Sequence, residues 1–132
     1  MSTHILTVDL GERSYPIIIG RNLLASGFDL AKYMPGNHCL VVTNETVGPL
    51  YLEKLQGCLP GMTSRSLALP DGESFKTSAT MQTIIDELVT DKAGRDTTVV
   101  ALGGGVVGDI AGFASACYMR GVAFVQVPTT LP

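Results

Sequence analysis

TTVVALGGGVVGDIAGF, residues 97–113, is the stretch on which our fold prediction rests. It opens with a run of strand-forming residues and continues through three consecutive glycines into an apolar segment. The part from Gly103 to Gly108 satisfies the pattern G-x-G-x-x-G between a strand and a helix, the context in which this pattern binds a nucleotide diphosphate. Glycines let backbone N–H groups come close to the diphosphate, and the helix N-terminus adds unpaired donors and a partial positive charge. The alternative is a tight turn that only packs the helix on the sheet.

Strands and helices alternate on either side of this stretch. Apolar, strand-forming runs predict further strands at residues 39–43, 66–69 and 122–127. Helices are predicted at residues 46–59 and 78–92. We expect Gly94 to end the second helix. Strands that alternate with helices predict a parallel sheet with right-handed crossovers.

The amino-terminal residues have a different pattern. Apolar residues alternate with polar ones over residues 6–10 and again over 15–19, which predicts a half-buried β-hairpin. Pro16 indicates that the second of these strands lies at an edge, and a short helix is expected at residues 20–26. The predicted fold class is therefore α/β: a Rossmann-like parallel sheet with flanking helices and an amino-terminal β-hairpin. We expect residues 1–132 to be one incomplete domain.

Composition narrows the class of protein. Hydrophobic residues make up 45% of the 132 residues and charged residues 16%, which indicates a globular chain with strands buried on both faces. The net charge is -3 and the basic residues are scattered, so nucleic acid is not expected as a partner. No apolar run approaches the roughly 18 residues of a membrane span, and the first residues lack a secretory signal pattern. We expect a cytoplasmic protein without a membrane partner.

Cysteines and histidines do not indicate a metal site. Cys39, Cys58 and Cys117 are odd in number and far apart, so we expect three reduced, mostly buried thiols. His4 and His38 are the only histidines, and neither has a carboxylate at metal-ligand spacing. Both are predicted to lie at the surface or at strand ends.

Candidate binding residues follow several predicted strands. Ligands of parallel sheets bind at the carboxyl ends of the strands. A Rossmann site usually has an acidic residue at the end of the strand after the glycine turn, but here that strand ends in Gln126-Val127-Pro128. Glu45 and Glu73, which follow other strands, could instead accept hydrogen bonds from ribose hydroxyls.

Each of the charged candidates also has a purely structural interpretation. Asp109 would be favoured near the start of a helix, and Arg120 would be favoured at the end of one, by the helix dipole alone. Lys76 could be a solvated surface charge. An arginine at the edge of a cleft is, however, also suited to binding phosphate.

Taken together, the motifs resemble those of the 3-dehydroquinate synthases. They are Pro70-Asp71-Gly72-Glu73-x-x-Lys76, Gly103-Gly104-Gly105-Val106-Val107-Gly108-Asp109, Tyr118-x-Arg120-Gly121 and Gln126-Val127-Pro128-Thr129-Thr130. The resemblance runs from about Ile5 to Leu131. It implies a lyase of the shikimate pathway that converts 3-deoxy-arabino-heptulosonate 7-phosphate to 3-dehydroquinate and phosphate.

The resemblance also implies cofactors and a partner. NAD is used catalytically to oxidise and later reduce a ring carbon, and a divalent metal, zinc or cobalt, polarises oxygens of the sugar-phosphate substrate. The family implies a homodimer. Its metal ligands lie in a helical domain that follows the NAD-binding domain, so we expect no metal ligands within these residues.

Individual residue roles are carried over from the family's motifs. Arg120 is expected to bind the substrate phosphate, either in its own site or in the site of a neighbouring subunit. The expected NAD-binding residues are Asn44, Glu45, Asp71, Gly72, Glu73, Ser74, Phe75, Lys76, Gly104, Gly105, Val106, Val107, Gly108, Asp109, Thr129 and Thr130. No catalytic residue is assigned.

Three other interpretations remain open at this point. The chain could belong to a sister sugar-phosphate cyclase with another substrate. It could resemble the glycerol or iron-dependent alcohol dehydrogenases, although these usually have serine after the glycines and Ala-Lys after the aspartate. It could also be a non-catalytic nucleotide-binding or partner module. In every case we expect the 132 residues by themselves to bind NAD weakly or not at all and to lack enzyme activity.

Overall fold

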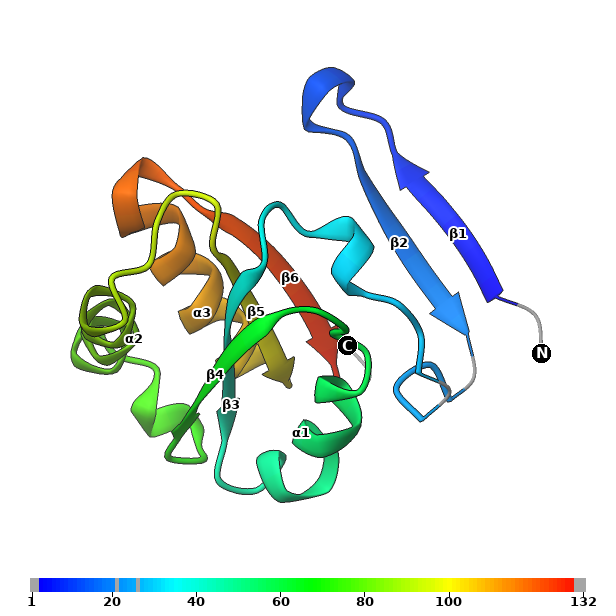
Figure 1. Ribbon diagram of the computed structural model, residues 1–132. Helices are drawn as coiled ribbons and strands as arrows, with labels where there is room; N and C mark the ends of the chain where they lie inside the picture. The colour runs from blue at the N-terminus through cyan, green and yellow to red at the C-terminus, as the bar shows by residue number, and fades with distance from the viewer. Residues whose placement is uncertain (1–2, 21, 26, 130–132) are drawn as a thin grey trace.

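A four-stranded parallel sheet forms the centre of the structure (Figure 1). The computed structural model describes residues 3–20, 22–25 and 27–129. The strands lie in the order β4-β3-β5-β6 and every neighbouring pair is parallel. Their bounds are β3 His38–Asn44, β4 Thr63–Leu69, β5 Thr98–Gly103 and β6 Ala123–Pro128. The predicted parallel sheet is confirmed.

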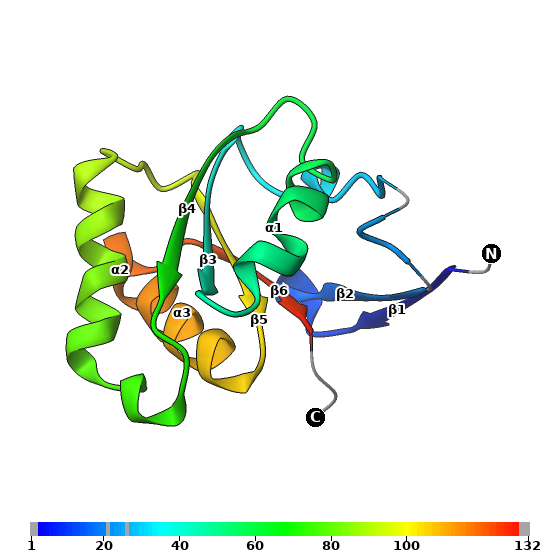
Figure 2. The ribbon, with the colours of Figure 1, turned by 90° about the horizontal axis from the view of Figure 1, so that it is seen from below.

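Helices cover both faces of this sheet, as predicted (Figure 2). Helix α1, Gly48–Gln56, packs on one face, and helices α2, Ser78–Thr90, and α3, Gly105–Cys117, pack on the other. The two central strands are buried on both sides: every residue of β5 and six of the seven residues of β3 are buried. Their unbroken runs of apolar and β-branched residues suit this position, because both faces of each strand meet a helix layer.

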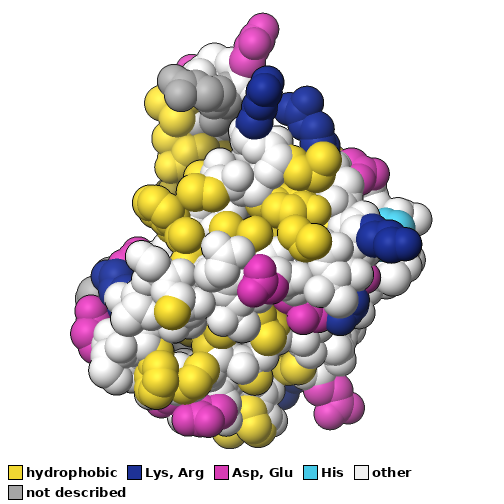
Figure 3. All heavy atoms as spheres, turned by 90° about the vertical axis from the view of Figure 1, so that its left-hand side faces the viewer, with side chains coloured by type: hydrophobic (Ala, Val, Ile, Leu, Met, Phe, Trp, Pro, Cys, Tyr) yellow, Lys and Arg dark blue, Asp and Glu magenta, His cyan; other side chains and the backbone are white. Residues whose placement is uncertain are grey.

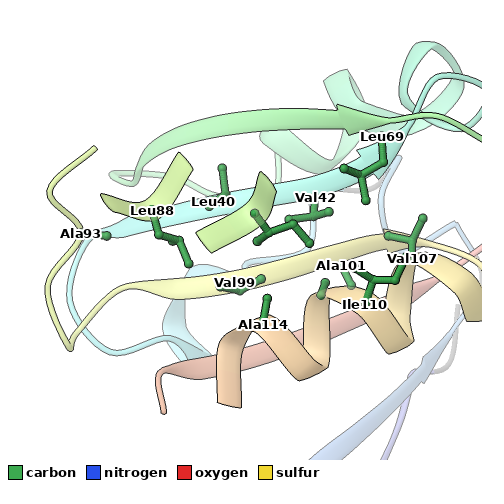
Figure 4. Close-up of a cluster of buried hydrophobic side chains, with 12 residues drawn as sticks. Leu40, Val42, Leu69, Leu88, Ala93, Val99, Ala101, Val107, Ile110 and Ala114 are labelled. Carbon is green, nitrogen blue, oxygen red and sulfur yellow. The ribbon is translucent and has the colours of Figure 1, made fainter. Parts of the chain in front are cut away.

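Two hydrophobic cores result, one on each face. Leu40 and Val42 point from β3 toward α2 and α3, whereas Cys39 and Val41 point toward α1. Figure 4 shows the first core, where side chains from β3 and β5 meet those of α2 and α3. Full burial of one such aliphatic side chain contributes about 1.5–3 kcal/mol. Packing between the sheet and its helices therefore supplies the main stabilisation of this part of the chain.

The end of α2 differs from the prediction. Thr77 caps its start as expected for a threonine, with Oγ1 accepting a hydrogen bond from the backbone N–H of Thr80 at 3.2 Å. At the other end Lys92, with φ +54°, takes the left-handed position, and the backbone N–H of Ala93 donates to Leu88 O at 3.0 Å. This is the Schellman arrangement. The prediction that Gly94 ends the helix was wrong, because Lys92 adopts the left-handed conformation two residues earlier.

Two other predicted helices need correction. Helix α1 begins at Gly48 rather than at residue 46, because Asn44 Oδ1 accepts hydrogen bonds from the backbone N–H groups of Thr46 and Val47 and holds these residues in a turn. The short helix expected at residues 20–26 is absent from its described part, residues 22–25, which form a turn. Asn22 has φ +54°, which a right-handed helix does not allow.

The amino-terminal hairpin is a separate two-stranded sheet, β1 Thr3–Val8 and β2 Tyr15–Gly20 (Figure 1). Leu6 pairs with Ile17, and Pro16 lies in an edge strand as predicted. The prediction of a half-buried hairpin was wrong for the described residues: Leu6 is 55% exposed, Ile17 42% and Ile19 53%. The hairpin stands away from the helices that cover the main sheet (Figure 1), so neither of its faces joins a hydrophobic core of the described residues.

Among the described residues, no helix is both long and apolar enough to cross a membrane. The histidines and cysteines mostly follow the prediction. His4 and His38 are exposed, and all three cysteines are free thiols, of which Cys39 and Cys58 are buried and Cys117 is exposed.

Candidate functional site

The strand order places a topological switch point at the carboxyl ends of β3 and β5. The chain moves from β3 through α1 to β4 on one side, and from β5 through α3 to β6 on the other side, with the two helices on opposite faces. The loops that follow β3 and β5 therefore diverge, which is the point where open α/β sheets bind their ligands. The glycine turn lies at this point.

The glycine turn leaves the start of α3 open. Gly104 is the N-cap residue and makes no side-chain hydrogen bond to the helix. A Cβ atom built on Gly105 would have no other atom within 4 Å apart from its chain neighbours and its own helix backbone. The first backbone N–H groups of a helix have no partner inside the helix. The first turn of α3 thus offers free space beside donors suited to an anion.

The other residues of the glycine motif have a packing role. Val107 is buried and Val106 is partly buried in the core beneath α2, so only their backbone atoms are available to a ligand. A Cβ atom on Gly108 would clash with Nε2 of Gln126 on β6. Gly108 therefore allows α3 to pack against β6, as the structural interpretation of the motif requires.

Thr129 lies beside the same turn. Its backbone N–H donates to Gly103 O at 3.1 Å, which ties the end of β6 to the glycine turn. Its hydroxyl Oγ1 is buried and has no hydrogen-bond partner among the described residues. The same holds for Oγ1 of Thr43, at the end of β3. Buried hydroxyls normally find a partner, so these atoms leave unused hydrogen-bonding capacity at the carboxyl edge. The prediction for Thr130 lies outside the described residues.

The loop after β4 contacts α3 through one ion pair. Lys76 Nζ lies 2.7 Å from Asp109 Oδ2. The hydrogen bond to Asp109, its charge and that of Glu73 raise the pKa of Lys76, so the amine is charged at neutral pH. The pair borders an open groove of about 370 Å³ between the start of α2 and the exposed side of α3. The groove is lined by Lys76, Thr77, Ser78, Met81, Asp109, Ile110 and Phe113.

A second polar network joins the loops after β3 and β4. Asn44 Nδ2 donates to Asp71 Oδ1 at 3.3 Å, and Thr46 Oγ1 donates to Asp71 Oδ2 at 2.8 Å. The backbone N–H of Asp71 donates to Glu45 Oε1 at 3.4 Å. The side chain of Asn44 therefore forms hydrogen bonds within these loops. Gly72 has φ +126°, which a residue with a side chain rarely adopts, and it begins the 3₁₀ turn Glu73–Phe75, in which Ser74 and Phe75 are exposed.

Arg120 is not near these groups. It lies between α3 and β6, at the amino end of the sheet, whereas the glycine turn lies between β5 and α3, at the carboxyl end. Thirteen helical residues separate the two points, or about 20 Å at 1.5 Å per residue. Arg120 therefore cannot reach the glycine turn of its own chain.

Some residues of the site were not predicted from the sequence. Thr46 and Thr77 are polar residues that follow strands and precede helices, a signal that was available but common. Met81 and Phe113 also line the groove, and the helical spacing of Met81 indicated only core packing. Within the described residues there is no group of three or more His, Cys, Asp or Glu residues that could hold a metal ion.

Fold and site together define an α/β domain of the Rossmann-like class, with an open glycine turn at its topological switch point. The family model described as 3-dehydroquinate synthase N-terminal matches residues 66–132, and the chain belongs to this family. It is 52% identical over 130 residues to a 3-dehydroquinate synthase of Shewanella piezotolerans. That match covers 98% of the chain but only 36% of the relative, so the chain spans about a third of the length of the curated relatives it matches.

Solved structures of two related synthases are also similar. A 2-deoxy-scyllo-inosose synthase complexed with carbaglucose-6-phosphate, NAD+ and Co2+ is 25% identical, with a TM-score of 0.78 over 96% of this chain and 35% of that one. A 2-epi-5-epi-valiolone synthase of Streptomyces hygroscopicus subsp. jinggangensis with NAD+ and Zn2+ bound is 32% identical, with a TM-score of 0.78 over 93% of this chain and 34% of that one. The parallel sheet and hairpin of this chain therefore occur in longer enzymes.

Proposed function

We propose that the chain is the NAD-binding portion of a 3-dehydroquinate synthase, which converts 3-deoxy-arabino-heptulosonate 7-phosphate to 3-dehydroquinate and phosphate in the shikimate pathway. The observation that carries the proposal is the open space at Gly105, where a Cβ atom would meet nothing within 4 Å, at the start of α3. The identity of 52% to the Shewanella relative supports this substrate over that of a sister cyclase.

The residues at the carboxyl edge fit a dinucleotide. The diphosphate would lie against the first backbone N–H groups of α3, from Gly105 to Val107, because this is the positive end of the helix dipole. The unpaired hydroxyl of Thr129 would donate a hydrogen bond to the cofactor and so gain a partner. Carboxylates of the loops after β3 and β4, Glu45 and Glu73, would accept hydrogen bonds from ribose hydroxyls. Gly72 would hold the second loop in its turn.

Lys76 and Asp109 would orient the cofactor at the groove beside α3. In the absence of a ligand they neutralise each other across 2.7 Å. A bound dinucleotide would take over one or both of these contacts, with the ammonium suited to phosphate oxygens and the carboxylate to hydroxyl or amide donors. The chemistry that NAD supplies when bound is the transient oxidation of a ring hydroxyl, which acidifies the neighbouring C–H so that phosphate can be eliminated.

A divalent metal, zinc or cobalt, would polarise substrate oxygens in the complete enzyme. We propose that its ligands belong to a helical domain outside these 132 residues. Residues 1–132 would then be an incomplete NAD-binding domain. The cytoplasm is the proposed location, because NAD chemistry and the three free cysteines suit a reducing compartment. Nucleic acid and membranes are not proposed as partners, in line with the net charge of -3.

The position of Arg120 supports a homodimer. The residue lies about 20 Å from the glycine turn of its own chain, at the other end of α3. A substrate phosphate bound near that turn could be reached only by the Arg120 of a second copy. Its guanidinium would bind phosphate oxygens in a bidentate manner.

The proposal can be tested with a chimeric enzyme, called the joined enzyme below, in which residues 1–132 replace the matching third of the Shewanella piezotolerans synthase. We expect the joined enzyme to release phosphate and form 3-dehydroquinate when NAD and zinc are present. Residues 1–132 alone should do neither. A joined enzyme that folds but does not bind NAD would refute the proposal, and so would phosphate release by the isolated chain.

Gly105→Ala is the most direct variant. Its methyl group would enter the space reserved for the diphosphate, and we expect NAD to bind the joined enzyme at least about tenfold more weakly, since a lost charge-assisted hydrogen bond is worth about 1.5–3 kcal/mol. Gly57→Ala is the matched control, because it adds the same group at the far end of α1. Equal NAD affinity in the two variants, measured by calorimetry, would argue against the site.

A further inference from the structure

The turn that carries Arg120 has an unusual backbone. Met119 and Arg120 both have positive φ, +48° and +65°, and Gly121 follows with φ +112°. Two consecutive non-glycine residues in the left-handed region are rare, because their Cβ atoms crowd the backbone. Such a conformation persists only where the surroundings enforce it, and it tends to occur at functional positions.

An arginine that only stabilised the carboxyl end of α3 would not need a left-handed backbone conformation. The dipole of α3 favours a positive charge near its carboxyl end, but an arginine in a relaxed conformation would satisfy that preference equally. Arg120 is exposed, and no salt bridge between described residues includes it. The guanidinium is thus part of an exposed residue on a strained turn, and no described residue forms a salt bridge with it.

Three hydrogen bonds enforce the turn. The backbone N–H of Gly121 donates to Tyr118 O at 2.8 Å, and that of Val122 donates to Ser115 O at 2.9 Å. The third bond comes from a side chain: the hydroxyl of Tyr118 donates to Ala93 O at 2.6 Å, with Leu88 O more distant at 3.5 Å. Tyr118 is the only residue of the turn whose side chain links it to another element by a hydrogen bond among the described residues.

The acceptor of that bond is itself fixed. Ala93 belongs to the Schellman end of α2, where its backbone N–H is bound to Leu88 O, and its side chain is buried. The Tyr118 hydroxyl thus connects the strained turn to the hydrogen-bonded end of α2. The two helices already pack together through the core on that face of the sheet.

We infer that Tyr118 is a positioning residue, whose hydrogen bond to Ala93 holds the left-handed turn so that Arg120 projects toward a phosphate group bound by a second copy of the chain. This inference rests on the proposed function of Arg120. Tyr118 itself would not touch the substrate. Loss of its hydroxyl would let the turn relax, so Arg120 would still be charged but would no longer be pre-oriented.

The test uses the joined enzyme with the variants Arg120→Ala, Tyr118→Phe and the double variant. Arg120→Ala should raise KM for the heptulosonate phosphate, and the inhibition constant of inorganic phosphate, by about tenfold or more, since a charge-assisted contact is lost. Tyr118→Phe should raise both by about threefold to tenfold, the effect of one neutral hydrogen bond, and leave kcat within about twofold. In the Arg120→Ala background Tyr118→Phe should have no further effect on either constant.

Two more variants separate positioning from stability. Gly121→Ala strains the same turn while leaving the Tyr118 hydroxyl intact, and it should also raise KM. Tyr51→Phe is the control, because the hydroxyl of Tyr51 makes no hydrogen bond to another described residue. If Arg120→Ala raises KM but Tyr118→Phe does not, or if Tyr118→Phe acts equally with and without Arg120, the positioning role is refuted. If Arg120→Ala itself leaves KM unchanged, the proposed function of Arg120 fails first.

Discussion

Two glycines of one motif differ in their surroundings, although the sequence pattern treats them alike. Gly108 faces β6, where the amide of Gln126 occupies the place of a side chain. The same is true of Gly112, one turn after the motif, where the ring of Phe124 lies only 3.3 Å from a Cβ position. Gly105 faces open space. The spacing of the motif thus combines a packing requirement with a ligand-binding requirement, and only a structure separates them.

This difference predicts opposite effects of the same substitution. Gly108→Ala should lower the free energy of unfolding by about 1–3 kcal/mol, because α3 or Gln126 must move to admit the methyl group. Gly105→Ala should leave it unchanged or raise it by up to about 1 kcal/mol, because alanine favours a helix over glycine. Urea unfolding of the two variants at equal protein concentration measures the difference. Equal destabilisation would show that Gly105 is also packed.

The buried thiol of Cys39 leads us to expect that the free energy of unfolding falls at alkaline pH. Desolvation in the core raises the pKa of this thiol from 9.0 to about 11. The folded state then holds its proton at a pH where the unfolded state loses it, so the associated stability is present below pH 9 and is lost as the pH rises toward 11. The loss is about 3 kcal/mol, because the pKa differs by about two units between the folded and unfolded states and each unit corresponds to about 1.4 kcal/mol.

Cys39→Ala provides the comparison for this pH effect. The variant should be less stable at pH 7 because it leaves a cavity, but its urea midpoint should fall less steeply between pH 8 and pH 11 than that of the parent chain. Cys58 changes in the same direction, since burial raises its pKa as well, so some slope should remain. Parallel slopes in variant and parent would refute the assignment to Cys39.

At the scale of elements, the sequence predicted those strands and helices whose residues have one clear physical role. The buried strands β3 and β5 have the unbroken apolar runs that burial on both faces requires, and helix α2 has an apolar face at helical spacing. Element ends were not predictable, because side-chain hydrogen bonds and left-handed residues decide them. Lys92 ends α2 where glycine was expected, and Asn44 delays the start of α1.

The hairpin β1–β2 should be the least protected element of the chain. A two-stranded hairpin without a covered face is marginally stable in water. The amide hydrogens of β1 and β2 should therefore exchange orders of magnitude faster than those of β3 and β5, which are buried in the main sheet. Hydrogen–deuterium exchange at low protein concentration measures this difference. Protection of the hairpin equal to that of β5 would mean that another surface covers it.

At the scale of the whole molecule, the sequence predicted which loops meet but not how they meet. Parallel strands place their carboxyl ends at one edge, so the convergence of the loops after β3, β4 and β5 followed from the fold class. The Lys76–Asp109 pair joins residues 33 positions apart, and the placement of Arg120 at the opposite edge depends on the length of α3. Such relations require the packed structure, because no local pattern encodes them.

The exposed apolar surface predicts that the isolated chain self-associates. Besides the hairpin, Phe113 and Leu50 are exposed, and hydrophobic side chains reach the surface on the α2 side (Figure 3). The outer edges of strands β4 and β6 pair with no other strand of the described residues. Open strand edges and apolar patches favour contacts between chains. Light scattering coupled to size-exclusion chromatography of residues 1–132 should give a mass that rises with concentration.

The hairpin should contribute most to this association, because it exposes Leu6, Tyr15 and Ile17 on one face of an unsupported sheet. Substituting Leu6 and Ile17 together by lysine should shift the chain toward the monomer, since the face would gain two charges in place of its central cross-strand pair. Leu50→Lys, at an equally exposed position on α1, should leave the distribution unchanged. A concentration-independent monomer in the parent chain would contradict the prediction, and an equal shift in the Leu50 variant would place the contact elsewhere.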